Sequence, residues 1–494
     1  MRNRNNGNFF ESGTSSLGVL FFIIFLLLLA VGISGPRLIG SQPELSLADL
    51  VTGMPVSQPS IGRLFPLRVK ATNTANGVCS LKVSLFQGGI GKELVTKTGV
   101  AGSWLKSWTR PWTGELSGPD KPIDLAAQGM TAAEAELVVE ASDCSFWGRK
   151  AVGHYAVTVD LLPPTLALTS TQHYINQGGA DVATYSVSAD AVISGIKVGP
   201  YEFTGYSKPG GASGDRFAFF VWSYELSEET QAQVFARDAA GNEATAALVP
   251  AKFFKKEFRQ RDIPIDDKFI ETKVRDIIAQ TPELKSTGDN LKDYIQVNRE
   301  LRRVNARFLV DLAKQSAPQF YWKDAFRPLT NAAVEASFAD CRTYFYNQQE
   351  VDKQVHLGFD LAVVEHNPIL AAASGQVLLA GFLGIYGNTI IIDHGYGLMT
   401  LYAHLSSMDV VKGDLIQKDQ KIANSGATGL AAGDHLHFSM LIQGIQTNPI
   451  EFWDQHWIDD HVYLRIGKAA FQSSDDRSQP PSQKTVAEPA SGTL

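Results

Sequence analysis

The spacing of apolar and polar residues changes several times along the chain, and each pattern predicts a different kind of element. Near the start of the chain, apolar and polar residues do not alternate. Residues 17–33 read LGVLFFIIFLLLLAVGI, a continuous apolar run without a charge. At about 1.5 Å per residue, a helix of this length covers about 25 Å, the lower end of what spans a bilayer core. We expect a transmembrane anchor over 17–35 after a cytoplasmic N-terminus, 1–16.

The charges around this run predict its orientation. Arg2 and Arg4 precede it, and basic residues favour the cytoplasmic side of a membrane. The bulk of the chain would then be periplasmic or extracellular, held at the cytoplasmic (inner) membrane by a single pass. Two alternatives stay open: a cleaved signal peptide, for which Ala30, Gly32 and Ser34 offer small residues, and a buried core helix.

Period-two alternation follows and predicts strands. It is clear in HYAVTVDL, which ends at Pro163-Pro164, and again in TYSVSADAVISGIKV. A Gly241-Asn242 pair between two alternating runs reads as a hairpin turn. We expect a β-sandwich module over 58–164 and an immunoglobulin-like β module over 165–252.

The period then changes to that of an amphipathic helix. Ile270, Val274, Ile277 and Ile278 share one face, and similar spacing continues to Phe308. We expect a helical connector over 256–320, which either packs on its own chain or acts as a regulatory lid or partner helix. The tail, 467–494, is polar and Pro-rich, and we expect it to be disordered.

Composition limits the classes of function. The 494 residues carry a net charge of −7, which gives no basic surface for nucleic acid. Of three cysteines, Cys79 and Cys144 lie in strand-like runs and could pair in an oxidising compartment, which leaves Cys341 over. None has the spacing of a Cys-rich metal site.

Histidines concentrate near the end of the chain. The patterns HLGFD (356–360), YAH (402–404) and HLH (435–437) hold most of the excess. His435 and His437 would share one face of a strand, and His356 and Asp360 could point together in an extended segment. Two imidazoles and a carboxylate suit zinc, and the two histidines left over could handle protons. This reasoning does not decide which of His435 and His437 is a ligand.

The same segment resembles the lysostaphin/LytM-like zinc metallopeptidases. Besides the three histidine patterns, AAASGQVLLAG, GNTIIIDHGYGLMTLYAHLS and VVKGDLIQKDQKIANSGATG match that family over about 330–455. The resemblance implies a β-sheet metallopeptidase domain, which we place at 325–466, with one Zn²⁺ per chain. It implies His356, Asp360 and His437 as zinc ligands, and His404 and His435 as catalytic residues.

Two positions depart from the family pattern. Ala339 stands in SFADCR where the family commonly has a Ser-Phe-Gly-x-Arg type turn, and Asp419 stands where Gly is usual. All five site residues are present. We expect His394, in DHGYG, to shape a turn rather than bind metal.

The expected architecture is therefore mainly β and multidomain, with an anchor, two immunoglobulin-like modules, a helical connector and a LytM-like domain. The resemblance implies a membrane-anchored endopeptidase that cuts stem peptides or cross-bridges of cell-wall peptidoglycan. One alternative is a catalytically silent scaffold that binds peptidoglycan or activates a partner hydrolase. Another is a processing protease. The β modules or the connector could bind an envelope protein.

Overall fold

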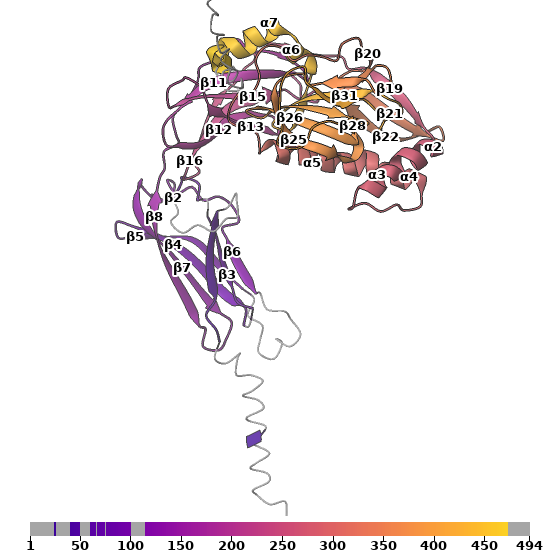
Figure 1. The fold of residues 1–494 in the computed structure, drawn as a ribbon. Helices are drawn as coiled ribbons and strands as arrows, with labels where there is room; N and C mark the ends of the chain where they lie inside the picture. Colours follow the sequence, from indigo (N-terminus) through magenta and orange to yellow (C-terminus); the bar gives the residue numbers. More distant parts are fainter. Residues whose placement is uncertain are drawn as a thin grey trace, which may run out of the picture. The chain divides into compact units, whose positions relative to one another are not determined.

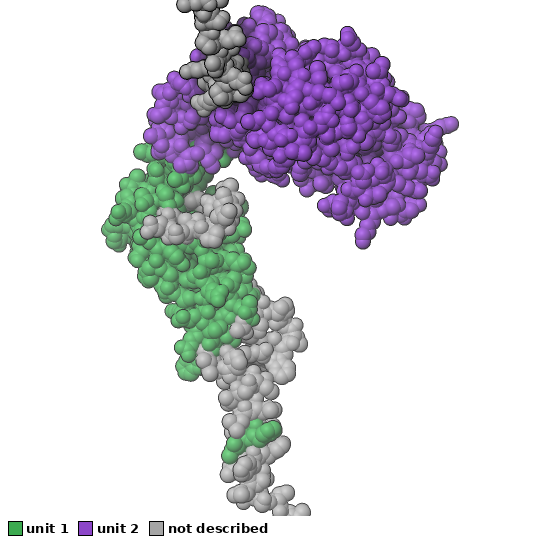
Figure 2. Space-filling view, viewed as in Figure 1, with its two compact units in different colours: residues 1–163, 237–242 green, residues 164–236, 243–494 purple. Residues whose placement is uncertain are grey.

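The computed structural model describes residues 24–25, 40–49, 60–65, 67–74, 76–99 and 114–472. These residues are mainly β and form two compact units, residues 1–163 with 237–242 and residues 164–236 with 243–494 (Figures 1 and 2). The expected anchor lies outside the described residues, apart from Ile24 and Phe25. In the part of the chain that is described, no helix has both the length and the apolar character needed to cross a membrane.

Unit 1 contains a five-stranded sheet of order β2-β8-β7-β4-β5 and a three-stranded sheet of order β1-β3-β6. The inward faces of both sheets share one apolar core that includes Phe65, Leu81 and Val139. Cys79 and Cys144 form a disulfide bond. The strands are β1 (Glu44–Asp49), β2 (Ser60–Ile61), β3 (Leu67–Thr72), β4 (Val78–Gln87), β5 (Ile90–Thr98), β6 (Glu115–Gly118), β7 (Ala133–Asp143) and β8 (Lys150–Val159).

Unit 2 begins with two four-stranded sheets, of orders β14-β15-β11-β9 and β13-β12-β16-β17, and a parallel pair β10-β18. Aromatic residues of β15 belong to the apolar core, because the run FAFFV (217–221) is fully buried on both faces of the strand. The strands are β9 (Leu166–Leu168), β10 (Tyr174–Asn176), β11 (Ala180–Val187), β12 (Ala191–Val198), β13 (Tyr201–Thr204), β14 (Tyr206–Ser207), β15 (Asp215–Val221), β16 (Ala232–Asp238), β17 (Glu243–Ala247) and β18 (Lys252–Phe254).

The rest of unit 2 is built on an eight-stranded sheet of order β20-β23-β31-β27-β26-β25-β29, with β32 paired to β31. Small sheets β19-β21-β22 and β24-β30-β28 flank it. The strands are β19 (Gln260–Ile265), β20 (Ala333–Ala336), β21 (Asp340–Tyr346), β22 (Gln349–His356), β23 (Phe359–Ala362), β24 (Pro368–Leu370), β25 (Gly375–Phe382), β26 (Asn388–Gly395), β27 (Leu398–Ala403), β28 (Ser407–Met408), β29 (Leu415–Ile416), β30 (Lys421–Asn424), β31 (Leu436–Ile442) and β32 (Ile445–Thr447).

Helical segments lie before and after the strands of this sheet in sequence, and one short segment, η3, lies between β25 and β26. The first group is capped by Asp266 and Asp289, whose side chains accept backbone N–H groups of the first turns. The segments are α2 (Asp267–Phe269), η1 (Ile270–Val274), α3 (Arg275–Gln280), α4 (Asn290–Ile295), η2 (Gln296–Leu301), α5 (Arg302–Ala313), η3 (Gly384–Tyr386), α6 (Pro449–Trp453), α7 (Gln455–Trp457), η4 (Ile458–Tyr463), α8 (Leu464–Ile466) and α9 (Ala469–Gln472).

The prediction of a helical connector over 256–320 is wrong at its start. Residues 260–265 form β19, which pairs in parallel with β21. Ile263 and Ile265 favour a strand, and Pro264 is tolerated because β19 lies at the edge of its sheet. The helices that follow bury Val274, Tyr294 and Leu309 in one core with strands of the large sheet, so they pack on their own chain.

The tail predicted to be disordered from 467 also needs correction. Residues 467–472 include α9, and Phe471 is buried against Phe320 with ring centroids 3.9 Å apart. One aromatic side chain in an otherwise polar tail therefore holds its first residues to the core. That core is shared, because it joins residues of β11 and β15 to residues of the large sheet.

Candidate metal centre and its groove

The small sheet β19-β21-β22 and two adjacent strands of the large sheet together position the three expected ligands. β22 ends at His356, a short turn follows, and β23 brings Asp360 directly opposite His437 of β31. The antiparallel pairing therefore joins residues 77 positions apart in sequence at one point of the sheet. His435 directly precedes β31, and His437 is the second residue of that strand.

The three ligand atoms converge. His356 Nε2 lies 2.9 Å from Asp360 Oδ1 and 3.0 Å from His437 Nδ1, and the latter two atoms are 2.9 Å apart. All three residues are buried. They form a group of the kind that holds a metal ion.

The hydrogen bonds around the two imidazoles show whether this donor set fits a cation. His356 Nδ1 donates to Ser337 O at 3.0 Å, so its Nε2 keeps the lone pair. Ser439 Oγ donates its proton to Leu357 O at 2.7 Å and must accept from His437 Nε2, so His437 Nδ1 keeps its lone pair. Two imidazole lone pairs and a carboxylate oxygen then face one another, an arrangement that repels unless a cation lies between them.

The protonation states suit the same conclusion. Burial alone would raise the pKa of Asp360, but His356, His435 and His437 hold it well below its usual range. Burial lowers the pKa of His437 to about 4. A metal needs an ionised carboxylate and neutral imidazoles. Arg342 Nη2 donates to Asp360 Oδ2 at 2.8 Å, which orients the carboxylate and leaves Oδ1 facing the histidines.

The other two histidines lie beside this centre. The ring centroid of His404 is 4.9 Å from that of His435 and 5.7 Å from that of His437. His404 Nδ1 donates to Thr428 O at 2.8 Å and His435 Nδ1 to Gly433 O at 2.9 Å. In the neutral form of each ring, Nε2 therefore carries the lone pair. The Nε2 of His435 lies 3.4 Å from Asp360 Oδ1, and against the effect of burial this carboxylate raises the pKa of His435.

His404 is also held in an uncommon backbone conformation. Its φ is +63°, in the left-handed region, directly after β27 ends at Ala403. Its N–H donates to Tyr386 O at 2.9 Å. Such strain persists where surrounding contacts impose it, and here it directs the ring toward the metal centre. Burial, followed by the neighbouring histidines His435 and His437, lowers the pKa of His404 well below its usual value.

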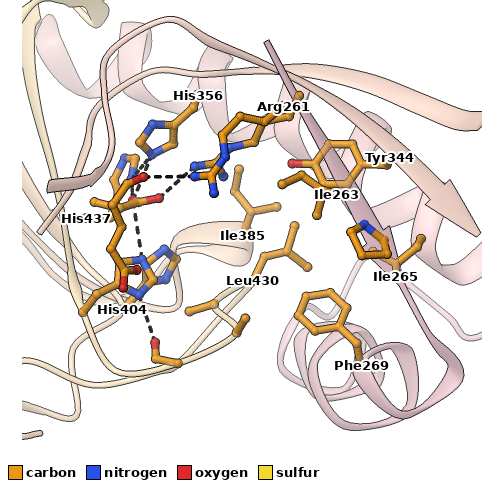
Figure 3. Close-up of a pocket in the computed structure, with 18 of the residues that line it drawn as sticks. Arg261, Ile263, Ile265, Phe269, Tyr344, His356, Ile385, His404, Leu430 and His437 are labelled. Carbon is orange, nitrogen blue, oxygen red and sulfur yellow. Dashed lines mark hydrogen bonds and ion pairs between the residues drawn. The ribbon is translucent and has the colours of Figure 1, made fainter. Parts of the chain in front are cut away.

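The centre opens into a cavity of about 420 Å³ with two different halves. Figure 3 shows the histidines and Arg261 at one side and a group of apolar side chains at the other. The apolar half is lined by Ile263, Ile265, Phe269, Ile385 and Leu430. Three of these come from β19 and α2, so the segment before the large sheet supplies a wall of the groove.

The structure brings together all five residues that the sequence singled out. It adds Arg342 and Ser439, to which the sequence analysis gave no role. Ser439 had a signal, because it follows His437 by two positions on the same strand face. Arg342 had a partial signal, because it ends SFADCR as an Arg ends the family's Ser-Phe-Gly-x-Arg type turn. Its contact with Asp360 had none, since it joins strands β21 and β23 of different sheets.

The departures from the family pattern are accommodated. Ala339 has φ +64° and its N–H donates to His356 O at 2.7 Å, so the turn keeps a left-handed residue without glycine. Asp419 has φ +68° and pairs with Arg327 at 2.9 Å. His394 is buried and its ring contacts Ser374 O and Thr400 Oγ1, as expected of a structural residue.

Comparison with known families gives the class of this domain. Residues 354–449 match the model of peptidase family M23. This part of the chain is therefore an M23 peptidase domain, and the resemblance to the lysostaphin/LytM-like family is confirmed. The M23 family supports assignment of the chain to the hydrolases.

Similarity to individual proteins is concentrated in the same segment. The chain is 37% identical over 97 residues to the DD-carboxypeptidase/endopeptidase Mpg of Neisseria meningitidis, covering 20% of this chain and 22% of that protein. It is 38% identical over 88 residues to the peptidoglycan DD-endopeptidase ShyB of Vibrio cholerae, covering 18% of this chain and 21% of the other. The matched segments thus span about a fifth of these relatives.

A longer match at lower identity reaches beyond the family segment. Stage II sporulation protein Q of Bacillus subtilis is 29% identical over 212 residues, which cover 42% of this chain and 69% of that protein. Among solved structures, the catalytic domain of lysostaphin from Staphylococcus simulans is 23% identical and covers 30% of this chain and 96% of its own, with a TM-score of 0.20.

Proposed function

We propose that this protein is a zinc-dependent endopeptidase that hydrolyses peptide cross-links of peptidoglycan, tethered to the cytoplasmic membrane and facing the periplasm or cell exterior. The observation that carries the proposal is the convergence of His356 Nε2, His437 Nδ1 and Asp360 Oδ1, whose other ring and carboxylate atoms are already engaged. Three protein ligands leave one tetrahedral position of zinc open, which is the pattern of catalytic sites.

Each side chain of the site then has a definable task. Zinc bound there supplies Lewis-acid activation of water and of the scissile carbonyl. In their neutral forms His404 and His435 each present an Nε2 lone pair to the cavity, so either ring can take a proton from the attacking water. Once protonated, the ring can return it to the leaving amine. Thr428 O and Gly433 O fix the tautomers that this requires.

The substrate assignment is supported by relatives and by the shape of the groove. Mpg and ShyB are named for DD-endopeptidase activity, and ShyB for peptidoglycan. The groove places an apolar wall, including Ile263 and Phe269, beside the polar centre, which suits a peptide with a small apolar side chain near the scissile bond.

The test is digestion of purified sacculi by the full chain and by His437→Ala. We expect cross-linked dimer fragments to disappear with the wild type, and the loss to require His437 and to be prevented by a chelator. An unchanged fragment profile with a fully zinc-loaded protein would contradict the proposal.

A second candidate is a scaffold that binds peptidoglycan or an envelope partner without cleaving it. The observation in its favour is the match to stage II sporulation protein Q. That protein's name states no hydrolase activity, and the match extends well beyond the family segment. Retention of the wild type on sacculi without fragment release would support it. In that case His437→Ala should bind sacculi as well as the wild type does.

A further inference from the structure

The turn between β7 and β8 carries two adjacent aromatic side chains that the fold leaves uncovered. Phe146 is 78% exposed and Trp147 69% exposed, and their rings contact each other edge to face at 5.4 Å. Two large apolar side chains exposed together at the tip of a turn are typical of an interaction site.

The turn holds these side chains in a fixed arrangement. Gly148 N donates to Ser145 O at 3.1 Å, which makes Phe146 and Trp147 the two central residues of a tight turn. Buried Asp143 accepts from Ser145 Oγ and from the backbone N–H of Arg149, both at 2.7 Å. The disulfide from Cys144 to Cys79 ties the same turn to β4.

The place of this turn relative to the start of the chain is also defined. Ser41 N donates to Asp143 Oδ2 at 3.0 Å, and Asn73 Nδ2 donates to Ser41 O at 2.8 Å. In the sequence, the uncharged stretch that contains the apolar run ends at Pro36. Five residues reach at most about 18 Å, so the turn lies close to where that stretch ends.

Within residues 143–150, the exposed charged side chains are of one sign. Arg149 and Lys150 are exposed, whereas Asp143, the last residue of β7, is buried and accepts hydrogen bonds from the turn. Tryptophan concentrates at membrane interfaces, and basic side chains are attracted to anionic headgroups. The turn combines both features.

From these observations we infer that the turn 144–150 docks on the surface of an anionic phospholipid bilayer, on the outer side of the membrane. Phe146 and Trp147 enter the headgroup region, and Arg149 and Lys150 contact lipid phosphates. The inference rests on the proposed anchoring by the N-terminal run, to which it adds a second contact that is independent of that run.

The opposite end of the same sheet offers a matched control. β4 pairs with β7, and Val78 lies opposite Asp143 at one end while Phe86 lies opposite Glu136 at the other. Beside the turn at that second end, Phe86 of β4 is 42% exposed and Ile90 of β5 is 63% exposed. The ten residues of β4 separate the two ends by about 30 Å, so a bilayer contacted by one turn cannot reach the other.

The experiment uses the full chain with a specific protease site inserted after Pro36. The protein is reconstituted in phosphatidylcholine vesicles that contain about 30% phosphatidylglycerol, cut, and sedimented. We expect the cut wild type and Phe86→Ser/Ile90→Ser to stay with the vesicles. The variant Phe146→Ser/Trp147→Ser should bind with at least about tenfold lower affinity.

Other outcomes would overturn the inference. The inference fails if the cut Phe146→Ser/Trp147→Ser variant stays with the vesicles as well as the cut wild type does. It also fails if the cut wild type leaves the vesicles at once. Retention on purified sacculi but not on vesicles would assign the turn to polysaccharide instead. Sedimentation of the uncut chain tests the anchor separately: if the uncut chain fails to enter vesicles but the cut wild type binds them, the anchoring proposal fails and the docking turn stands.

Discussion

At the scale of single residues, the metal centre depends on side chains that do not touch the metal position. Ser439 accepts from His437 Nε2 only because its own proton goes to Leu357 O. Ser439→Ala removes this acceptor, and loss of such a partner typically weakens metal affinity about 10–100-fold. We expect this loss in a chelator competition assay with zinc. Ser407→Ala, in a different strand, should leave zinc affinity unchanged; equal effects would contradict the tautomer assignment.

The two groups of histidines should separate experimentally. His437→Ala removes a ligand and should abolish zinc retention together with activity. His404→Ala should keep about one zinc per chain and lose activity by about 10²–10⁴-fold, the usual contribution of acid–base catalysis. Metal analysis and sacculus digestion on the same preparations measure both quantities. A His404→Ala protein that lacks zinc would assign His404 to the ligand set instead.

The sequence predicted the metal ligands of this site but not the contacts that hold them. The ligands were predictable because HLGFD and HLH place them on strand faces, and the family resemblance separated His437 from His435. The contact of Arg342 with Asp360 and the carbonyl partners of the histidines could not be predicted, since they depend on how sheets and loops pack. The left-handed φ of His404 is imposed by tertiary contacts and has no local signal.

At the scale of elements, the helices before the large sheet form part of its core. Leu309 of α5 is fully buried, whereas Val304 of the same helix is 53% exposed. Leu309→Ala should lower the free energy of unfolding by about 2–5 kcal/mol, and Val304→Ala by less than about 0.5 kcal/mol. Denaturant titration of each variant measures this.

The same pair of variants tests the alternative of a regulatory lid. A lid would be weakened by Leu309→Ala and would expose the groove, so activity on sacculi would rise. Packing in a shared core predicts the reverse, because loosening α5 disturbs the sheet that holds the histidines. A clear gain of activity by Leu309→Ala at unchanged stability would favour the lid.

A buried carboxyl group joins α6 to the immunoglobulin-like part of unit 2. Glu451 accepts from Ala180 N at 2.6 Å and from Asn176 Nδ2 at 2.9 Å. Burial raises the pKa of Glu451 from its ordinary value of 4.5 to about 7. The folded state therefore holds a proton that the unfolded state has released, and the stabilisation from protonation is lost as the pH rises through this window.

This shift predicts a pH dependence of unit 2. Between pH 4.5 and 7 the free energy of unfolding should fall by about 3 kcal/mol from this group, at 1.36 kcal/mol per pKa unit. Glu451→Gln should flatten that slope, although it also loses one acceptor at every pH. The exposed Glu365→Gln should leave the slope unchanged. Equilibrium unfolding at several pH values measures this slope of free energy against pH. If Glu451→Gln has the same slope as the wild type, Glu451 is not the group responsible.

The sequence predicted secondary structure correctly where the periodic pattern of apolar residues extends over many residues. The alternating runs and the amphipathic helices are present, but β19 and α9 were missed. β19 is a short edge strand that forms only because β21 offers a free edge. α9 depends on the contact of Phe471 with Phe320, which no local pattern reveals.

At the scale of the whole molecule, the two compact units have separate cores, and this has a thermodynamic consequence. The disulfide lies entirely in unit 1 and joins residues 65 positions apart. Closing a loop of that length stabilises a fold by about 4 kcal/mol in the chain-entropy description. Cys79→Ser/Cys144→Ser should therefore destabilise unit 1 by roughly this amount.

Unit 2 should not respond, because its apolar clusters contain no residue of the disulfide-bearing sheet. Calorimetry of the full chain should show two transitions, of which the double variant shifts one and leaves the other in place. Zinc retention and sacculus digestion should be unchanged, since the metal centre and its groove lie wholly in unit 2. A common shift of both transitions would instead mean that the units unfold as one cooperative body, and a loss of zinc would place unit 1 among the supports of the metal centre.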